Sequence, residues 1–192
     1  MVRISEAIKD DHRKLESCYN IIVNSEDEDE RTRFQNQFTW ELARHSVAEE
    51  LVLFPAMEKL RSDGKEKLDD DRREHSALKE QLYVFQDLNS SDPRFIPTIT
   101  MMMEGLARHM QDEETNYLVI LEESLTFDES EKLAESLGRT KMFVPSRSHS
   151  YDLGNPHYET VADLLTAPLD HLRDLFRKWP EEEEGILTSP ML

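Results

Sequence analysis

The sequence predicts an all-α protein: an up-down-up-down four-helix bundle followed by additional short C-terminal helices. Apolar residues recur at three- and four-residue steps through the first 125 residues, a spacing typical of amphipathic helices. The chain has only five glycines and few β-branched runs, which argues against a sheet. Short polar breaks separate the periodic segments, as they do in helix bundles.

Four long helices are expected, at residues 5–23, 31–61, 65–88 and 94–125. Ser5 is the expected N-cap of the first helix. Acidic residues 24–30, the tripeptide at 62–64 and the turn at 89–93 provide the breaks. Pro55 lacks an N–H, so it is expected to kink or locally unwind the second helix.

The C-terminal third has a different pattern. A short helix is expected at 128–137, ended by Gly138, then a loop at 139–158 and short amphipathic helices at 160–166 and 168–179. The last of these should pack its apolar side on the bundle through Leu169, Leu172, Leu175, Phe176 and Trp179. The expected organisation is therefore a bundle at 1–126, a helical appendage packed on it at 127–180, and a flexible acidic tail at 181–192.

Charge and cysteine content narrow the classes of function. The 192 residues are 38% hydrophobic and 33% charged, with a net charge of −18 that disfavours nucleic acid and anionic membranes as partners. No stretch has the length of a membrane span or the apolar core of a signal peptide. Cys18 is the single cysteine, which excludes an internal disulfide and a thiolate zinc site and favours a cytoplasmic location.

Each predicted long helix carries one histidine on its inward apolar stripe. A single core histidine is usually structural, but four in one core would compete for few hydrogen-bond acceptors. Two glutamates follow at helix-face spacing, four residues after the histidines of the second and fourth helices. The candidate metal ligands are His12, His45, Glu49, His75, His109 and Glu113.

Imidazole and carboxylate together suit iron, manganese or zinc, whereas calcium and magnesium prefer oxygen alone. Two metals, each bound by two histidines and bridged by both glutamates, would use every ligand; one metal with ligands left over is the simpler alternative. The ferritin-like Glu-x-x-His pattern is excluded, since Lys9, Leu42, Arg72 and Leu106 precede the four histidines by three residues.

The order His12, His45-x-x-x-Glu49, His75, His109-x-x-x-Glu113 resembles the hemerythrin family, in its HHE cation-binding branch, over residues 4–125. The resemblance implies a non-haem di-iron centre that binds dioxygen or another small diatomic. By position, it assigns His12 and His45 to one iron and His75 and His109 to the other. Glu49 and Glu113 would be the bridging carboxylates.

Two positions depart from the oxygen-carrying members of that family. Lys79 stands where they have a second histidine one turn after the helix-three histidine, so an open position, Glu80 or water would replace that ligand. Their helix-four carboxylate is an aspartate at i+5, which here is Glu114; Glu113 is preferred because it repeats the helix-two spacing. These departures argue against simple reversible oxygen transport and fit redox or iron sensing, nitric oxide or peroxide chemistry, or iron handling.

Three functions follow as hypotheses. The first is a non-haem iron protein that binds or senses dioxygen, nitric oxide or another small oxidant, or handles iron, with no substrate turnover assigned. The second is a metal-free scaffold that binds a protein partner through the C-terminal helices. The third is hydrolysis at zinc, which requires a substrate cleft. His149, His157 and His171 are expected to be surface or packing residues.

Overall fold

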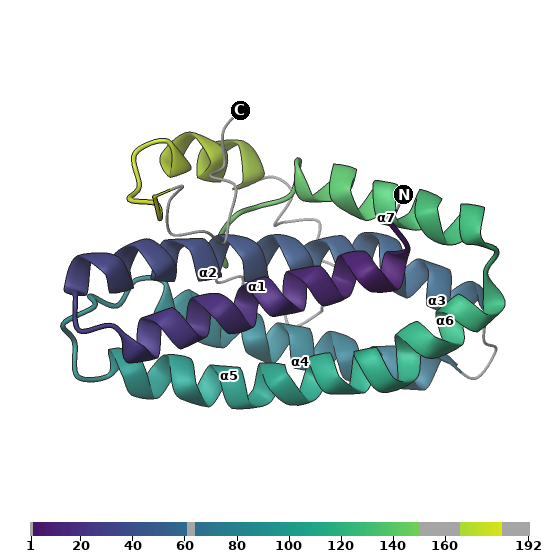
Figure 1. Ribbon diagram of the computed structural model, residues 1–192, viewed down its shortest axis with the longest axis horizontal. Helices are drawn as coiled ribbons and strands as arrows, with labels where there is room; N and C mark the ends of the chain where they lie inside the picture. The colour runs from purple at the N-terminus through teal and green to yellow at the C-terminus, as the bar shows by residue number, and fades with distance from the viewer. Residues whose placement is uncertain (1, 61–63, 150–165, 182–192) are drawn as a thin grey trace.

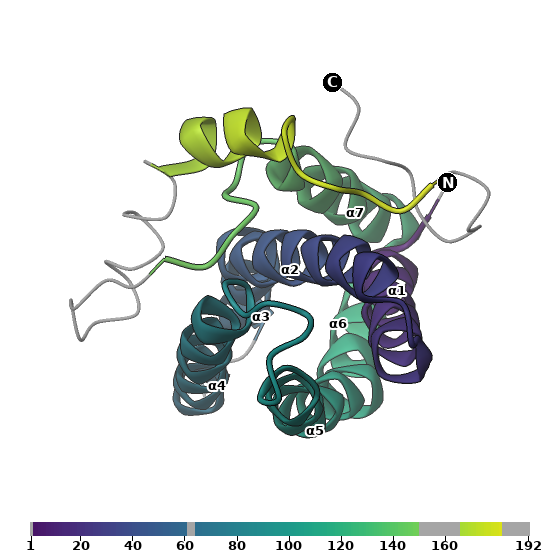
Figure 2. The same cartoon turned by 90° about the vertical axis from the view of Figure 1, so that its left-hand side faces the viewer.

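Four antiparallel helical rods form the body of the computed structural model, which describes residues 2–60, 64–149 and 166–181 (Figure 1). Viewed end-on, the rods of α1, α2, α4 and α5 surround a common interior, which confirms the predicted all-α bundle (Figure 2). In chain order the helices are α1 (Ile4–Asn24), α2 (Glu28–Ala48), η1 (Glu49–Leu53), α3 (Phe54–Leu60), α4 (Gly64–Phe85), α5 (Phe95–Asp112), η2 (Glu113–Tyr117), α6 (Leu118–Ser124) and α7 (Phe127–Lys141). A further helix covers 166–174.

The predicted second and fourth long helices each contain one π-helical turn. In η1 the N–H of Phe54 donates to the carbonyl of Glu49, five residues earlier, and in η2 the N–H of Leu118 donates likewise to Glu113. Pro55 follows η1, so the expected disturbance lies just before the proline. The turn η2 has no proline beside it, and no local pattern predicted it.

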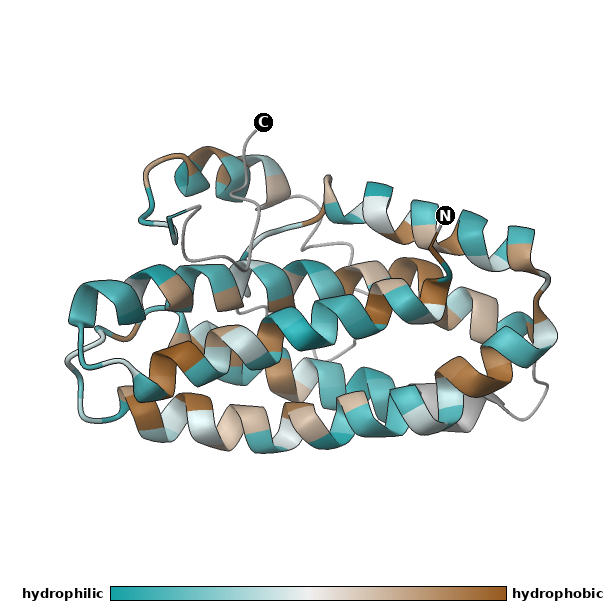
Figure 3. Ribbon diagram, in the orientation of Figure 1, coloured by the Kyte–Doolittle hydropathy of each residue, from teal (hydrophilic) through white to brown (hydrophobic). Residues whose placement is uncertain are grey.

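The core is divided into two apolar clusters with a polar layer between them. The first cluster includes Leu15, Ile22, Phe34, Phe38, Leu82, Phe85, Phe95 and Ile99. The second includes Ile4, Ile8, Leu53, Phe54, Met57, Leu118, Leu121 and Leu137. On α1, His12 lies between Ile8 of the second cluster and Leu15 of the first, and Figure 3 shows a hydrophilic middle on this helix with apolar colour toward both ends.

Helix α7 lies across α1 and α2 and contacts the turn η1 (Figures 1 and 2). It runs through Gly138 to Lys141, so the expected end at Gly138 is wrong. The last turn is held from outside the helix, because the guanidinium of Arg44 donates to the carbonyl of Lys141 at 2.6 Å. Leu137 is buried in the second apolar cluster, so α7 shares the core of the bundle.

Two expected features at the chain termini differ in the structure. The N-cap of α1 is Arg3 instead of Ser5, and the Glu6 carboxylate accepts from the Arg3 N–H at 3.0 Å. The helix at 166–174 buries its polar side, because Asp170 and Asp174 face inward. The expected packing of its apolar side is wrong for four residues, which are exposed: Leu169, Leu172, Leu175 and Phe176. Trp179 does pack on the bundle, with its ring centroid 6.2 Å from that of Trp40.

Polar contacts explain why that helix lies with its apolar side outward. His149 lies 2.8 Å from Asp170, and the ring of His171 bonds the carbonyl of Val144 at 2.8 Å. The Ser146 hydroxyl donates to the carboxylate of Asp174 at 2.5 Å. His157 and nearly all of the helix expected at 160–166 lie outside the described residues, as does the tail beyond residue 181. None of the helices described has an apolar stretch long enough to cross a membrane.

Candidate metal centre

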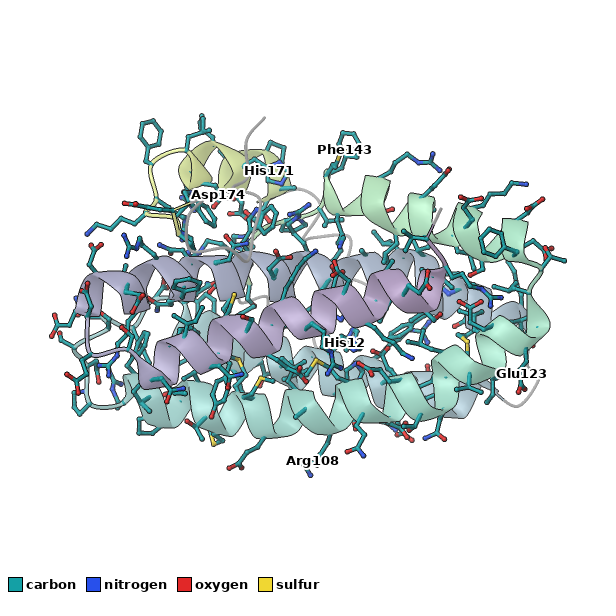
Figure 4. All side chains as sticks on the ribbon, in the orientation of Figure 1. His12, Arg108, Glu123, Phe143, His171 and Asp174 are labelled. Carbon is teal, nitrogen blue, oxygen red and sulfur yellow. The ribbon has the colours of Figure 1, made fainter. Side chains whose placement is uncertain are left out.

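The structure brings all six predicted ligand residues into the polar layer between the two apolar clusters. They come from four rods: α1, α2 with η1 and α3, α4, and α5 with η2 and α6. None of the six residues is more than 5% exposed. Figure 4 labels His12 within the bundle, where α1 faces the interior. Their donor atoms form two groups, each with all its atoms within 4.8 Å of one another: His12, His45, Glu49 and Glu113, and then Glu49, His75 and His109.

The two glutamates lie between the histidines. Glu49 is central, because Oε1 lies 3.2 Å from Nε2 of His45 and Oε2 lies 3.5 Å from Nε2 of His75. Glu113 Oε2 lies 3.3 Å from Nε2 of His12 and 3.7 Å from Nε2 of His109. Each carboxylate therefore faces one histidine of each pair that the resemblance assigned to an iron.

The imidazole rings lie in two pairs. The ring centroids of His12 and His45 are 5.1 Å apart, and those of His75 and His109 are 4.8 Å apart. In the second pair the two Nε2 atoms approach to 3.1 Å. Two imidazole nitrogens together with a nearby carboxylate oxygen are the donor set of a borderline divalent cation.

All four rings are oriented in the same way: Nε2 faces the interior and Nδ1 faces a carboxylate behind the ring. The four Nδ1 contacts are His12 to Glu114 at 2.8 Å, His45 to Asp11 at 3.5 Å, His75 to Glu50 at 3.2 Å and His109 to Glu74 at 3.1 Å. A carboxylate at Nδ1 favours the tautomer with its proton there, which leaves the Nε2 lone pair free for a cation.

Consecutive glutamates have different contacts at each π-helical turn. Glu49 faces the interior and Glu50 reaches Nδ1 of His75 from the neighbouring rod. Likewise Glu113 faces the interior, while Glu114 contacts His12 and Arg13. The preference for Glu113 over Glu114 as the inward residue agrees with this placement. Such π-helical turns are frequent at functional sites.

Several buried polar atoms of this layer have no hydrogen-bond partner among the described residues. They are His12 Nε2, both ring nitrogens of His45, both carboxylate oxygens of Glu49, and Glu113 Oε2. Unpaired buried polar atoms are costly, so their concentration at one place needs a physical reason. A bound cation would satisfy these donors, and the residues present therefore fit a metal.

The protonation states of two histidines favour cation binding. Burial lowers the pKa of His45 to about 4, and burial also lowers the pKa of His75. Both imidazoles are therefore neutral near pH 7, which is the form that binds a metal. Burial alone would lower the pKa of His109 as well, but the carboxylates of Glu74 and Glu113 beside it raise it.

The two inward glutamates are in conflict when no cation is present. Burial and the nearby Glu113 carboxylate raise the pKa of Glu49 well above its usual value. Burial also acts to raise the pKa of Glu113, but the contact with His12 and the charge of His109 lower it to about 2. Two buried carboxylates facing one another are therefore destabilising, and a divalent cation between them would remove the repulsion.

Lys79, at the position of the missing histidine, lies with its ammonium 3.2 Å from Glu50 Oε1. Glu50 is the same carboxylate that faces His75, so Lys79 and His75 share one partner. Glu80, the other candidate for the missing ligand, is exposed.

Sequence reasoning missed the carboxylates behind the rings, namely Asp11, Glu50 and Glu74, and left Glu114 outward without a role. Asp11 precedes His12 in sequence, yet it faces His45 on another rod. Helical periodicity describes one rod at a time, so it carries no signal for a contact made between rods.

A cavity of about 450 Å³ opens between α4 and α5 and reaches His109. It is lined by Glu74, Ala77, Leu78, Gln81, Gly105, Arg108, His109 and Asp112. Of the four carboxylates behind the rings, Glu74 is the most exposed: its side chain is 58% exposed, against 21% for Glu114, 8% for Glu50 and 2% for Asp11. The layer is therefore closest to solvent at His109.

Comparison with known proteins agrees with this geometry. The family model described as the hemerythrin HHE cation binding domain matches residues 3–121. An uncharacterised hemerythrin-like protein of Schizosaccharomyces pombe is 49% identical over 181 residues, which cover 94% of this chain and 89% of the relative. A DNA nickase of a Nostoc species is 23% identical over 147 residues, or 76% of this chain and 41% of that protein. No solved structure matches the chain.

Proposed function

The chain belongs to the hemerythrin HHE cation-binding family, and from this premise we propose that its polar layer holds a pair of iron ions that bind or sense a small oxidant. His12 and His45 would bind one ion, His75 and His109 the other, and Glu49 and Glu113 would bridge the two. The observation that carries this proposal is the group of unpaired, buried donor atoms from four rods. Bound iron would supply redox chemistry and coordination of a small diatomic.

The chain's own residues hold the donors in place. Apolar clusters on both sides exclude water from the layer, and the carboxylates behind the rings orient each Nε2 toward the interior. Nitrogen and carboxylate donors together favour iron, manganese or zinc over calcium or magnesium. The choice of iron follows from membership of the family. Metal analysis distinguishes iron from manganese and zinc.

We propose that the ligand is dioxygen, nitric oxide or another small oxidant, reaching the layer through the cavity beside His109. Each ion would have two histidine nitrogens and the oxygens of two bridging glutamates, which leaves positions free for a ligand. The Lys79 ammonium lies with Glu50, which supports a role other than the simple oxygen carriage of members with a histidine there. Sensing of an oxidant or handling of iron fits this arrangement, and we propose a cytoplasmic location.

A second candidate function is protein-partner binding by the C-terminal helix. Its Leu169, Leu172 and Phe176 side chains are exposed, which favours a contact surface. The zinc-dependent hydrolysis hypothesis is separated from iron binding by spectroscopy, because zinc is colourless. Nucleic-acid cleavage, the activity that the Nostoc relative's name states, gains no support from this surface, since a net charge of −18 opposes contact with phosphates.

The test is anaerobic reconstitution of the full chain with ferrous iron, followed by metal analysis and absorption spectra with and without dioxygen or nitric oxide. We expect about two irons per chain and new absorption bands when the ligand is added. His45→Ala and Glu49→Ala should each cut iron content sharply, whereas the control His149→Ala should not. Absence of iron from the reconstituted protein, or equal iron in all three variants, would refute the proposal.

A further inference from the structure

Helix α7 ends in a lysine whose ammonium reaches a buried carboxylate of the bundle. The Nζ of Lys141 donates to both carboxylate oxygens of Asp11, at 2.7 and 2.6 Å. Asp11 is buried, and the Lys141 side chain is 17% exposed. Lys141 lies outside the residues 3–121 that the family model matches.

Asp11 is the carboxylate behind His45. Its Oδ2 lies 3.5 Å from Nδ1 of His45, whose Nε2 faces Glu49 at 3.2 Å. The other three Nδ1 contacts are shorter, so Asp11 has the least room to move away before its contact with His45 is lost.

Two lysines lie near the Asp11 carboxylate. Lys141 is the nearer one, with its Nζ 2.6 Å from Oδ2 of Asp11. Lys14 is more distant, at 3.7 Å, and pairs with Asp10 at 2.7 Å. Lys141 is therefore the cation that donates to both oxygens of Asp11.

The backbone at the end of α7 is fixed to the same rod that carries His45. Arg44, the residue before His45, donates from Nε to the carbonyl of Lys141 at 2.6 Å. The lysine is thus placed by one bond through its backbone and two through its side chain.

We propose that Lys141 is a positioning residue of the metal centre: it holds the Asp11 carboxylate against Nδ1 of His45 and so directs Nε2 of His45 toward the metal. The inference rests on the proposed function, because it concerns the ion that His12 and His45 would bind. It makes α7 part of the metal centre.

The test compares full-chain variants reconstituted with iron. Lys141→Met keeps the length of the side chain and removes its charge, and Lys141→Arg restores a cation. Lys132→Met, at an exposed position of the same helix, is the matched control. The measurements are iron per chain, Mössbauer spectra that distinguish the two iron environments, and the rate of iron loss to a chelator.

In Lys141→Met we expect one of the two iron environments to be lost or altered, and that iron to leave about tenfold faster, because groups behind a ligating histidine typically change affinity by 10- to 100-fold. Lys141→Arg should restore both properties, and Lys132→Met should match the parent. If Lys141 had only a structural role, Lys141→Met would lower the melting temperature and would affect the two iron environments equally.

Unchanged iron environments and release rates in Lys141→Met would overturn the inference. If that variant does not fold because Asp11 is left unpaired, the double variant Asp11→Asn with Lys141→Met removes the buried charge and gives the same readouts. Parent-like retention of both irons in the double variant would overturn it as well. Failure of the parent chain itself to bind iron would count against the proposed function instead.

Discussion

At the scale of single residues, the molecule uses consecutive glutamates for two tasks. Glu49 and Glu113 face the interior, while Glu50 and Glu114 lie behind the rings of His75 and His12. The inward pair is unfavourable unless a cation lies between the carboxylates. This layer therefore lowers the folding stability of the metal-free protein while providing a binding site.

Glu49→Gln should stabilise the metal-free protein and abolish iron binding. The folded-state pKa of Glu49 is raised by burial and by Glu113, so the stability associated with this group is full below its ordinary pKa and declines as the pH rises toward the folded value. Each raised pKa unit corresponds to about 1.4 kcal/mol. Urea denaturation of the metal-free proteins at pH 7.5 should show the variant to be the more stable of the two.

The same comparison at pH 4.5 should show a smaller difference, because Glu49 is then protonated in the folded protein and about half protonated in the unfolded chain. Glu123→Gln, at an exposed position of α6 that Figure 4 labels, should leave both stability and iron content unchanged. A metal-free Glu49→Gln protein that is less stable than the parent at pH 7.5 would contradict the account of repulsion.

The six inward residues could be predicted because each lies in phase with the apolar residues of its own helix. Asp11 and Glu74 could not, because their partners His45 and His109 come from other rods. Lys141 lies 130 residues from Asp11 in sequence, a separation at which no periodic pattern relates two side chains.

At the scale of elements, the two π-helical turns each begin four residues after an inward histidine, His45 or His109. Each begins at an inward glutamate, which directs the following glutamate to a neighbouring rod. The cavity between α4 and α5 is the second feature at this scale, because small residues, Ala77 and Gly105, face it from opposite helices.

Gly105→Leu should slow ligand binding without changing iron content. A Cβ added at Gly105 meets no atom within 4 Å, so the longer side chain would occupy the cavity without a clash. Leucine also favours a helix interior over glycine by about 1 kcal/mol, so stability should not fall. Stopped-flow mixing of the reduced protein with nitric oxide should give a severalfold lower association rate.

Ala107→Leu, at an exposed position of α5 that does not line the cavity, is the matched control and should bind at the parental rate. Identical association rates in the glycine variant and the parent would mean that the ligand reaches the centre from another side.

Leu137→Ala should destabilise the whole bundle, although Leu137 belongs to α7. The side chain is buried with Ile4, Ile8 and Leu121, and such truncations cost about 2–5 kcal/mol. Urea denaturation followed by circular dichroism measures the loss. Phe143→Ala removes a larger but exposed side chain, which points away from the bundle in Figure 4, and should cost less than about 0.5 kcal/mol.

If Leu137→Ala lowered the free energy of unfolding by less than about 0.5 kcal/mol, the result would contradict a core shared by α7 and the bundle. The division into a bundle at 1–126 and an appendage at 127–180 stays a prediction, and this experiment bears on it directly. Helix α7 could be predicted from its periodicity, but its extension past Gly138 could not, because the bond from Arg44 that holds its last turn comes from another element.

At the scale of the whole molecule, the net charge of −18 and the inward carboxylates both favour cations. A protein that folds around two buried carboxylates and then binds a cation between them couples its stability to metal occupancy. The bundle with metal should therefore be the more stable form.

Removing the metal should lower the melting temperature by several degrees. A metal present at a hundred times its dissociation constant adds about 2.7 kcal/mol. For a chain of this size, each kcal/mol shifts the midpoint by about 2–4 °C. Calorimetry of iron-reconstituted protein before and after treatment with a chelator measures the change, and Glu49→Gln, which should not bind iron, should show none. Equal melting temperatures for the two forms of the parent would count against metal in the polar layer.

The sequence by itself determined the helical class, the four long helices and the inward phase of the six donor residues, because these depend on periodicity within one helix. Only the tertiary structure decided which carboxylate lies behind which ring, that α7 shares the core, and that the C-terminal helix turns its apolar side outward. Those features depend on contacts between residues distant in the chain, such as Lys141 with Asp11 and His149 with Asp170. Their energies arise when the rods pack, and no local pattern encodes them.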